Sequence, residues 1–202
     1  MLLLPLGAMA QTTAPDPATL PARDSHQGLL IAAIPVVSAS RYKELFAKNS
    51  PYDAGIIAID TFFRNDNDAP IRLNLNTIQL IIYLPGVDRQ RLTALTPEEV
   101  ADRTVITADS NPRVPRPFPF PSGGGNKKSK AWTELDTALR SVSISTDILP
   151  PHATTRGLLF FDMNHDVEAL RHSHLYIPDL MFMTDKSALF YFEIDLAATQ
   201  KK

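Results

Sequence analysis

The chain has 202 residues, a formal net charge of −2 and no cysteine. The near-neutral charge provides no broad basic field for nucleic acid. The missing cysteine excludes disulfides, thiolate metal sites, a cysteine nucleophile and a lipid-modified cysteine. This length predicts a single domain, with or without a tail, that is large enough to fold without a metal or a disulfide.

The first ten residues have the pattern of the end of a secretory signal peptide. Residues 2–6 are apolar apart from one proline, and residues 8–10 place alanines at the −3 and −1 positions before Gln11. We therefore expect residues 1–10 to be a signal peptide, and the protein to be exported to the periplasm or the extracellular space. The alternative is a cytosolic protein with a short apolar N-terminus. Residues 11–25 are rich in Pro, Ala and Thr and predict a flexible linker.

Strand and helix patterns follow in the first half of the chain. Residues 28–37 predict a strand and residues 41–47 a short helix. Residues 54–64 are apolar on both faces, which is typical of a central strand. Residues 65–70 are rich in Asn and Asp and predict a turn. Because strand alternation resumes over 71–83, we expect the two strands to form an antiparallel hairpin.

The alternation within 71–83 changes phase part-way along. Apolar residues first occupy positions 71, 73 and 75, and then positions 78, 80 and 82. A phase change in a period of two requires a bulge or a strand that passes from one sheet to another.

Two further helices are predicted. Thr96, Pro97 and Glu99 form a capping box with proline at the first helical position, and this helix is expected to end near Arg103. Residues 132–142 carry an apolar stripe, which indicates core packing rather than a cofactor site.

Four extended segments complete the pattern, at 143–149, 155–163, 175–183 and 188–196. Pro178 interrupts the third, which is therefore expected at a sheet edge. In the last, the residues predicted to share one buried face are Phe190, Phe192, Ile194 and Leu196. About seven short strands with three small helices favour an immunoglobulin-like antiparallel β-sandwich over residues 26–198.

Residues 109–130 contain the sequence PRVPRPFPFPSGGGNKKSK and predict a disordered surface loop. Basic residues with exposed aromatics between them suit docking to a partner protein or an anionic surface. The other interpretation is a tolerated insertion without a role. The candidate partner-binding residues are Arg113, Arg116, Phe118, Phe120, Lys127 and Lys128.

Two segments resemble bacterial extracytoplasmic immunoglobulin-like domains of the telokin-like class. GIIAIDTFFRNDNDAPIRLN is similar to their strand–turn–strand core, with the turn Asn65-Asp66-Asn67-Asp68-Ala69-Pro70. LPPHATTRGLLFFDM resembles their proline-containing turn before a glycine and an apolar strand. The resemblance implies an exported accessory or binding domain with a leader and a flexible linker. It implies no catalytic residues.

Histidines near the C-terminus are candidate metal ligands. His172 and His174 are two residues apart, so on a strand they would project to the same side, and His165 lies nearby in the sequence. Imidazole is a common metal ligand, and the nearby methionine thioethers favour Cu(I). The alternative is that these histidines belong to a polar connection without metal.

No catalytic signature is present. The sequence lacks a G-x-S-x-G elbow, an H-E-x-x-H pair, a P-loop and a G-x-G-x-x-G fingerprint. Asp60 lies within an apolar strand, where a buried carboxylate must be paired, hydrogen-bonded or protonated.

The leading hypothesis is a non-catalytic exported interaction or accessory module of the cell envelope, without a cofactor. It would bind an envelope protein or a surface component. It would neither bind nucleic acid nor span the membrane. The alternative is an exported copper- or zinc-binding protein that uses His165, His172 and His174. A hydrolase whose site is assembled only in space is a third hypothesis.

Overall fold

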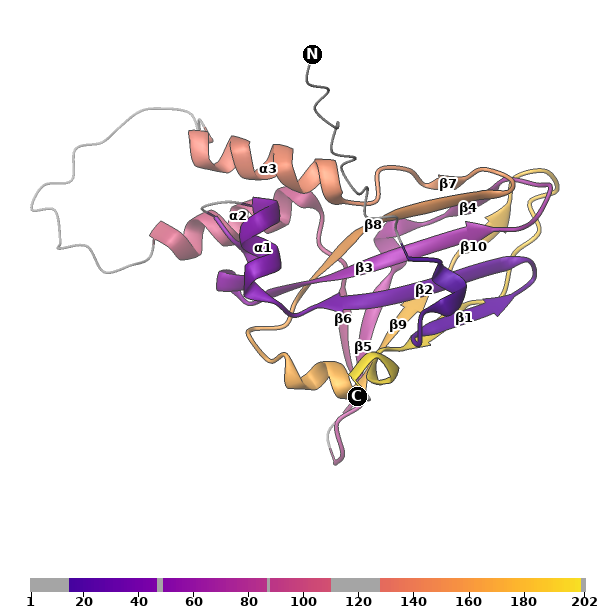
Figure 1. Cartoon of the computed structure of the whole chain (residues 1–202), viewed down its shortest axis with the longest axis horizontal. Coiled ribbons are helices and arrows are strands. Elements are labelled where there is room, and N and C mark those ends of the chain that lie inside the picture. The colour runs from indigo at the N-terminus through magenta and orange to yellow at the C-terminus, as the bar shows by residue number, and fades with distance from the viewer. Residues whose placement is uncertain (1–14, 47–48, 87, 110–127, 201–202) are drawn as a thin grey trace, which may run out of the picture.

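A computed structural model describes residues 15–46, 49–86, 88–109 and 128–200. Within these residues, eleven strands form three antiparallel sheets, and three α-helices accompany them. Figure 1 shows α1, α2 and α3 together at one end, with β4, β7 and β10 toward the other. The mostly β class predicted from the sequence is confirmed, with more strands and one more sheet than a seven-stranded sandwich contains.

Sheet A has the strand order β1-β2-β3-β8. Its strands are β1 (Arg23–His26), β2 (Leu29–Val36), β3 (Ile56–Asn65) and β8 (Ala153–Asp162). The strand β3 pairs along its whole length with β8 and along most of it with β2. The expected central position of this apolar segment is therefore confirmed.

Sheets B and C form the opposing layer. Sheet B has the order β10-β4-β7, with β4 (Ile71–Leu73), β7 (Ile148–Leu149) and β10 (Leu180–Phe182). Sheet C has the order β11-β9-β5-β6, with β5 (Gln79–Ile82), β6 (Gln90–Thr93), β9 (Ser173–Ile177) and β11 (Phe192–Asp195).

The main core lies between these two layers, and a second core lies under the helices. Along β3, Ile57 and Ile59 are buried in the core between the layers, whereas Ile56 and Ala58 are buried against the helices. This double burial explains why the strand is apolar on both faces.

The three α-helices pack on the outer face of sheet A. They are α1 (Ala39–Phe46), α2 (Pro97–Asp109) and α3 (Lys130–Val142). The capping box of α2 is confirmed, because the Glu99 carboxylate accepts from the Thr96 backbone N–H at 2.8 Å and the Thr96 hydroxyl accepts from the Glu99 N–H at 3.3 Å. This helix continues to Asp109, beyond the predicted end at Arg103.

The described residues also include five short 3-10 helices: η1 (Pro17–Thr19), η2 (Pro51–Ala54), η3 (Leu75–Thr77), η4 (Glu168–His172) and η5 (Leu196–Gln200). No helix within the described ranges is long and apolar enough to cross a membrane.

The predicted hairpin over 54–83 is wrong. The strand β3 belongs to sheet A and β4 to sheet B, so the polar turn 65–70 carries the chain between layers. The buried Asn65 amide fixes this crossing, since it donates to Ala69 O at 2.9 Å and Pro150 O at 3.1 Å. Turn chemistry gave the position of the turn but not the partner of the next strand.

The phase change within 71–83 is confirmed as a strand that passes between sheets. The strand β4 lies in sheet B and β5 in sheet C, with η3 between them. The inserted helical turn shifts the side-chain alternation by one residue, so both strands keep an apolar face toward the core.

Three other expectations differ from the structure. Part of the expected linker, 11–25, is ordered: η1 and most of β1 fall within it, and Leu20 and Ala22 are buried. Pro178 lies between β9 and β10, so β9 pairs on both sides and only β10 is an edge strand. Phe190 does not share the buried face of Phe192, because the chain joins β11 only at Phe192.

Candidate functional site

Most residues of the predicted docking loop lie outside the described ranges, namely Arg113, Arg116, Phe118, Phe120 and Lys127. Lys128 is described, and it packs on the helices. Its ammonium lies 2.5 Å from the Glu98 carboxylate and 3.5 Å from the centre of the Trp132 ring. Lys128 therefore ties the start of α3 to α2 through an ion pair and a cation–π contact.

The three histidines proposed as metal ligands lie in different elements. His165 is exposed in the turn after β8, His172 ends η4, and His174 lies on β9. His172 and His174 therefore do not share a strand, which was the basis for placing them on one side. Within the described residues, no group of three or more His, Asp or Glu side chains could hold a metal ion. The predicted three-histidine set is not formed.

A groove lined by both polar and apolar side chains lies where sheets B and C separate. The β4–β10 pairing ends at Leu73 and Leu180, and the β5–β9 pairing begins at Gln79 and Tyr176. Between these pairs, η3 interrupts one strand and the Pro178–Asp179 turn interrupts the other. The interruption leaves a groove of about 460 Å³ on this layer.

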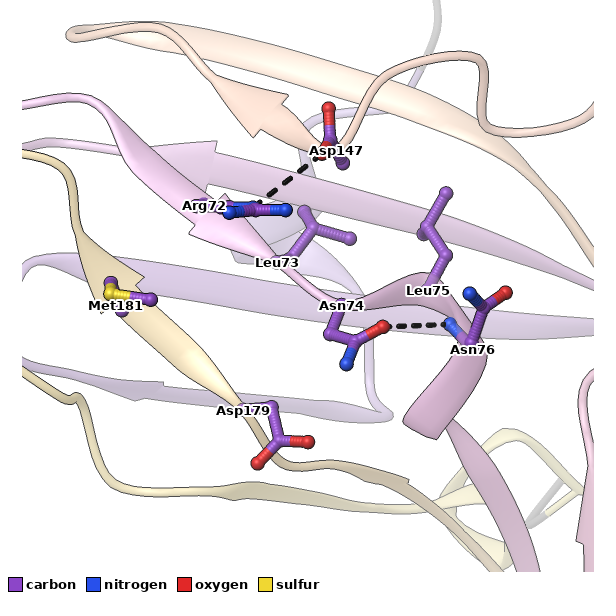
Figure 2. Close-up of a pocket in the computed structure, with 8 residues that line it drawn as sticks. All are labelled: Arg72, Leu73, Asn74, Leu75, Asn76, Asp147, Asp179 and Met181. Atoms are coloured by element: carbon purple, nitrogen blue, oxygen red, sulfur yellow. Dashed lines mark hydrogen bonds and ion pairs between the residues drawn. The ribbon is translucent and has the colours of Figure 1, made fainter.

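Figure 2 shows the residues that line the groove, which are Arg72, Leu73, Asn74, Leu75, Asn76, Asp147, Asp179 and Met181. The Arg72 guanidinium lies 3.6 Å from the Asp147 carboxylate. The Asn74 side-chain oxygen accepts from the Asn76 backbone N–H at 3.3 Å and caps η3. The register pairs Arg72 with Met181, so both project to the same outer face.

Other polar groups of the groove are available to a ligand. Among the described residues, neither the Asp179 carboxylate nor the Asn76 side-chain amide has a hydrogen-bond or ion-pair partner, and both residues are exposed. Asp179 has φ 52°, a left-handed conformation that Asp and Asn adopt more readily than most residues. The groove therefore combines one ion pair with unused acceptors and donors.

A cluster of Tyr83, His174 and Glu193 occupies the outer face of sheet C. The Tyr83 hydroxyl donates to the Glu193 carboxylate at 2.9 Å, and His174 Nδ1 lies 3.5 Å from the same oxygen. Arg89 lies 4.8 Å above the Tyr83 ring. Desolvation, followed by the hydrogen bond to Glu193, raises the pKa of Tyr83. The cluster holds its polar groups in mutual contacts.

An aromatic patch adjoins this cluster; we define it as the half-buried Tyr176 and the exposed Phe190 and Tyr191. Phe190 is 73% exposed and Tyr191 55%. The rings of Tyr176 and Tyr191 lie 5.3 Å apart.

The turn between β1 and β2 fixes the backbone that carries this patch. The Phe190 N–H donates to the Gln27 side chain at 2.7 Å, and the Tyr191 carbonyl accepts from His26 Nε2 at 3.2 Å. The His26 ring stacks on Phe192 with the ring centres 3.7 Å apart. These contacts fix the backbone that carries the exposed Phe190 and Tyr191 side chains.

The expected pairing of Asp60 is confirmed on the opposite layer. Its carboxylate accepts from Arg156 Nε at 2.9 Å and from Arg156 Nη2 at 2.6 Å. The Asp60 side chain is only 14% exposed, and this hydrogen-bonded pairing raises the pKa of Arg156. Arg156 also covers the Phe62 ring at 4.8 Å. This is a satisfied structural pair on the helix-covered side of the molecule.

Comparisons with known proteins yield little. No family model matches the sequence, and no curated protein matches it. One solved structure with some likeness is that of a functionally unknown protein from Listeria monocytogenes EGD-e. It shares 16% identity, with a TM-score of 0.35 over 78% of this chain and 70% of that chain. At that level the likeness supports no inference about this chain.

Sequence reasoning did not identify either the groove or the aromatic patch. The groove residues come from three separate segments that only the packing of sheets B and C brings together. The aromatic patch had a partial signal, because residues 190–192 place three aromatics in succession. Alternation placed Phe190 on the buried face, which concealed its exposure.

Proposed function

We propose that the protein is a non-catalytic interaction module, exported to the cell envelope, that binds an envelope component through the aromatic patch. The observation that carries the proposal is the exposure of the consecutive residues Phe190 and Tyr191, on a backbone fixed by Gln27 and His26. Grouped apolar side chains on a protein surface mark interaction sites more often than scattered ones do. Aromatic side chains provide much contact area for little loss of conformational entropy.

Composition at the patch supports binding rather than chemistry. Tyrosine is enriched at binding energy hot spots, and the patch adjoins the Tyr83–His174–Glu193 cluster with Arg89 over one ring. The cluster would supply a polar rim to an aromatic centre. No contact among the described residues favours the copper or zinc alternative.

Export is part of the same proposal and rests on the sequence pattern of residues 1–10, which lie outside the described ranges. We also propose an immunoglobulin-like relationship for the fold. It is supported by two antiparallel layers and by the crossing from β3 to β4, while the third sheet is an addition to that plan.

A photocrosslinking phenylalanine analogue at position 190 of the full chain tests the proposal in native cells. We expect the chain in the envelope fraction and a discrete crosslink to an envelope component. The matched control carries the analogue at Val37, which is 44% exposed but distant from the patch in sequence and lies beside α1. A chain that stays in the cytosol, or equal crosslinking from both positions, would refute the proposal.

A further inference from the structure

The groove between sheets B and C contains polar side chains that no contact among the described residues uses. Asn74 caps η3 and Arg72 pairs with Asp147, but the Asn76 amide and the Asp179 carboxylate are left unpaired within the described residues. Two carboxylates and one guanidinium leave the groove with one formal negative charge. An anionic ligand is therefore disfavoured, and too few ligating groups gather for a metal ion among the described residues.

The mixture of groups suits hydroxyls best. A carboxylate only accepts hydrogen bonds, a guanidinium only donates them, and an amide does both. A hydroxyl also does both, so a ligand with several hydroxyls can satisfy Asp179, Arg72 and Asn76 together. An alkylammonium could use the carboxylates alone and would leave the donors of Arg72 and Asn76 unmatched.

Two aromatic rings lie close to the end of the groove. Tyr176 precedes Asp179 by three residues, so their Cα atoms are at most about 11 Å apart. Tyr176 projects from the outer face of β9, because its neighbours Leu175 and Ile177 are buried in the core, and its ring contacts Tyr191. The apolar face of an exposed tyrosine ring can pack against the C–H face of a sugar, while its hydroxyl remains in water.

We propose that this groove, together with Tyr176 and Tyr191, binds a neutral oligosaccharide. The inference deepens the proposed function, on which it rests, by naming the chemical class of the envelope component. Hydroxyl groups would meet the polar side chains of the groove, and a neighbouring sugar ring would pack on the tyrosines. The open, exposed groove predicts weak binding to a single short chain and tighter binding to a repeating polymer.

Titration of the isotope-labelled full chain tests this, with backbone amide shifts followed by NMR. The probes are maltohexaose, cellohexaose and chitohexaose, each added separately, and trilysine serves as a cationic comparison. We expect saturable shifts at Asn76 and Asp179 with at least one of the three oligosaccharides.

Four variants locate the binding. Asn76→Ala removes the free amide, and Asp179→Asn removes the charge but keeps a residue that tolerates the left-handed backbone. Each is expected to weaken oligosaccharide binding about tenfold. The matched controls Gln90→Ala and Asp88→Asn, both exposed and outside the groove, should bind as the native chain does.

Three outcomes would overturn the inference: no saturable shift with any oligosaccharide, shifts that neither groove variant weakens, or groove shifts with trilysine alone. The position-190 crosslink separates this failure from failure of the proposed function. A specific crosslink without oligosaccharide binding removes only the sugar assignment. Absence of both removes the interaction module as well.

Discussion

The two outer faces of the molecule differ in how they treat their polar and aromatic groups. On the outer face of sheet A, the helices bury Tyr42 and Phe160, and the Tyr42 hydroxyl accepts from the Ala58 N–H at 2.5 Å. On the outer face of sheets B and C, Phe190 and Tyr191 are exposed. The first face uses aromatics as core, and the second presents them to solvent.

Polar groups follow the same division. Asp60 is nearly buried and fully used by Arg156, whereas Asp179 is exposed in the groove without a described partner. Burial forces a carboxylate to be paired, while exposure leaves it available to a ligand. The comparison indicates that substitutions on the helix-covered face change stability and substitutions on the exposed face change binding.

The largest expected effect is in the buried aromatic core of the covered face. Phe160→Ala removes a ring that is 1% exposed and should lower the free energy of unfolding by about 3–5 kcal/mol. Urea denaturation followed by circular dichroism measures it. Phe190→Ala is the matched control and should change stability by no more than about 0.5 kcal/mol. Equal losses in the two variants would abolish the distinction between the faces.

A backbone approach on β8 gives the next effect. A Cβ added at Gly157 would lie 2.5 Å from the Ile144 backbone nitrogen, where the chain leaving α3 crosses the strand. Gly157→Ala should therefore destabilise the protein by about 1–3 kcal/mol in the same denaturation experiment. A control is Gly86→Ser. The added Cβ meets no atom within 4 Å there, so any loss of stability comes from the φ of 73° alone, which serine adopts only with strain. Unchanged stability in Gly157→Ala would show that this contact is not tight.

Loss of the Asp60–Arg156 ion pair should have a smaller effect. Asp60→Asn breaks a bidentate pair, but the Arg156 side chain is 42% exposed and can be hydrated. We expect a loss of about 1 kcal/mol, and no measurable change for Asp179→Asn. Thermal unfolding of the two variants side by side measures the difference, and a larger loss in Asp179→Asn would reverse the comparison.

The smallest effect concerns pH at the start of α2. Two hydrogen bonds from Thr96, through its backbone and its side chain, lower the pKa of Glu99 in the folded protein. A carboxyl with a lowered folded pKa stabilises the fold above its unfolded pKa, and this stabilisation is lost as the pH falls through the folded pKa.

Glu99→Gln should therefore cost about 0.5 kcal/mol at neutral pH, a small value because the carboxylate is exposed. The difference from the native chain should disappear once the pH is below the folded pKa of Glu99. Denaturation at a series of pH values measures it. A difference that stays constant with pH would mean that charge has no part in the cap.

Local chemistry made much of the fold predictable. The Thr96–Glu99 box fixed the start of α2, and the phase change in 71–83 revealed the passage from sheet B to sheet C. Double-sided apolarity of β3 located the centre of sheet A. Each of these features depends on residues that are close in the sequence.

The features that were missed depend on contacts between distant segments. The strands that pair with β4 are β7 and β10, which lie far from it in the sequence. The backbone at Phe190 is fixed by a hydrogen bond to the distant Gln27. The groove needs both Arg72 on β4 and Asp179 in the turn before β10. Alternation within one strand cannot supply these relations, because it carries no information about register against distant partners.

The most direct test of the division between the faces is Tyr191→Ala in the full chain, measured for both unfolding and position-190 crosslinking. The ring is 55% exposed, so we predict a change in the free energy of unfolding of no more than about 0.5 kcal/mol, with loss of the crosslink to the envelope component. A variant that keeps the crosslink, or that loses it only because the fold is destabilised, would contradict the account.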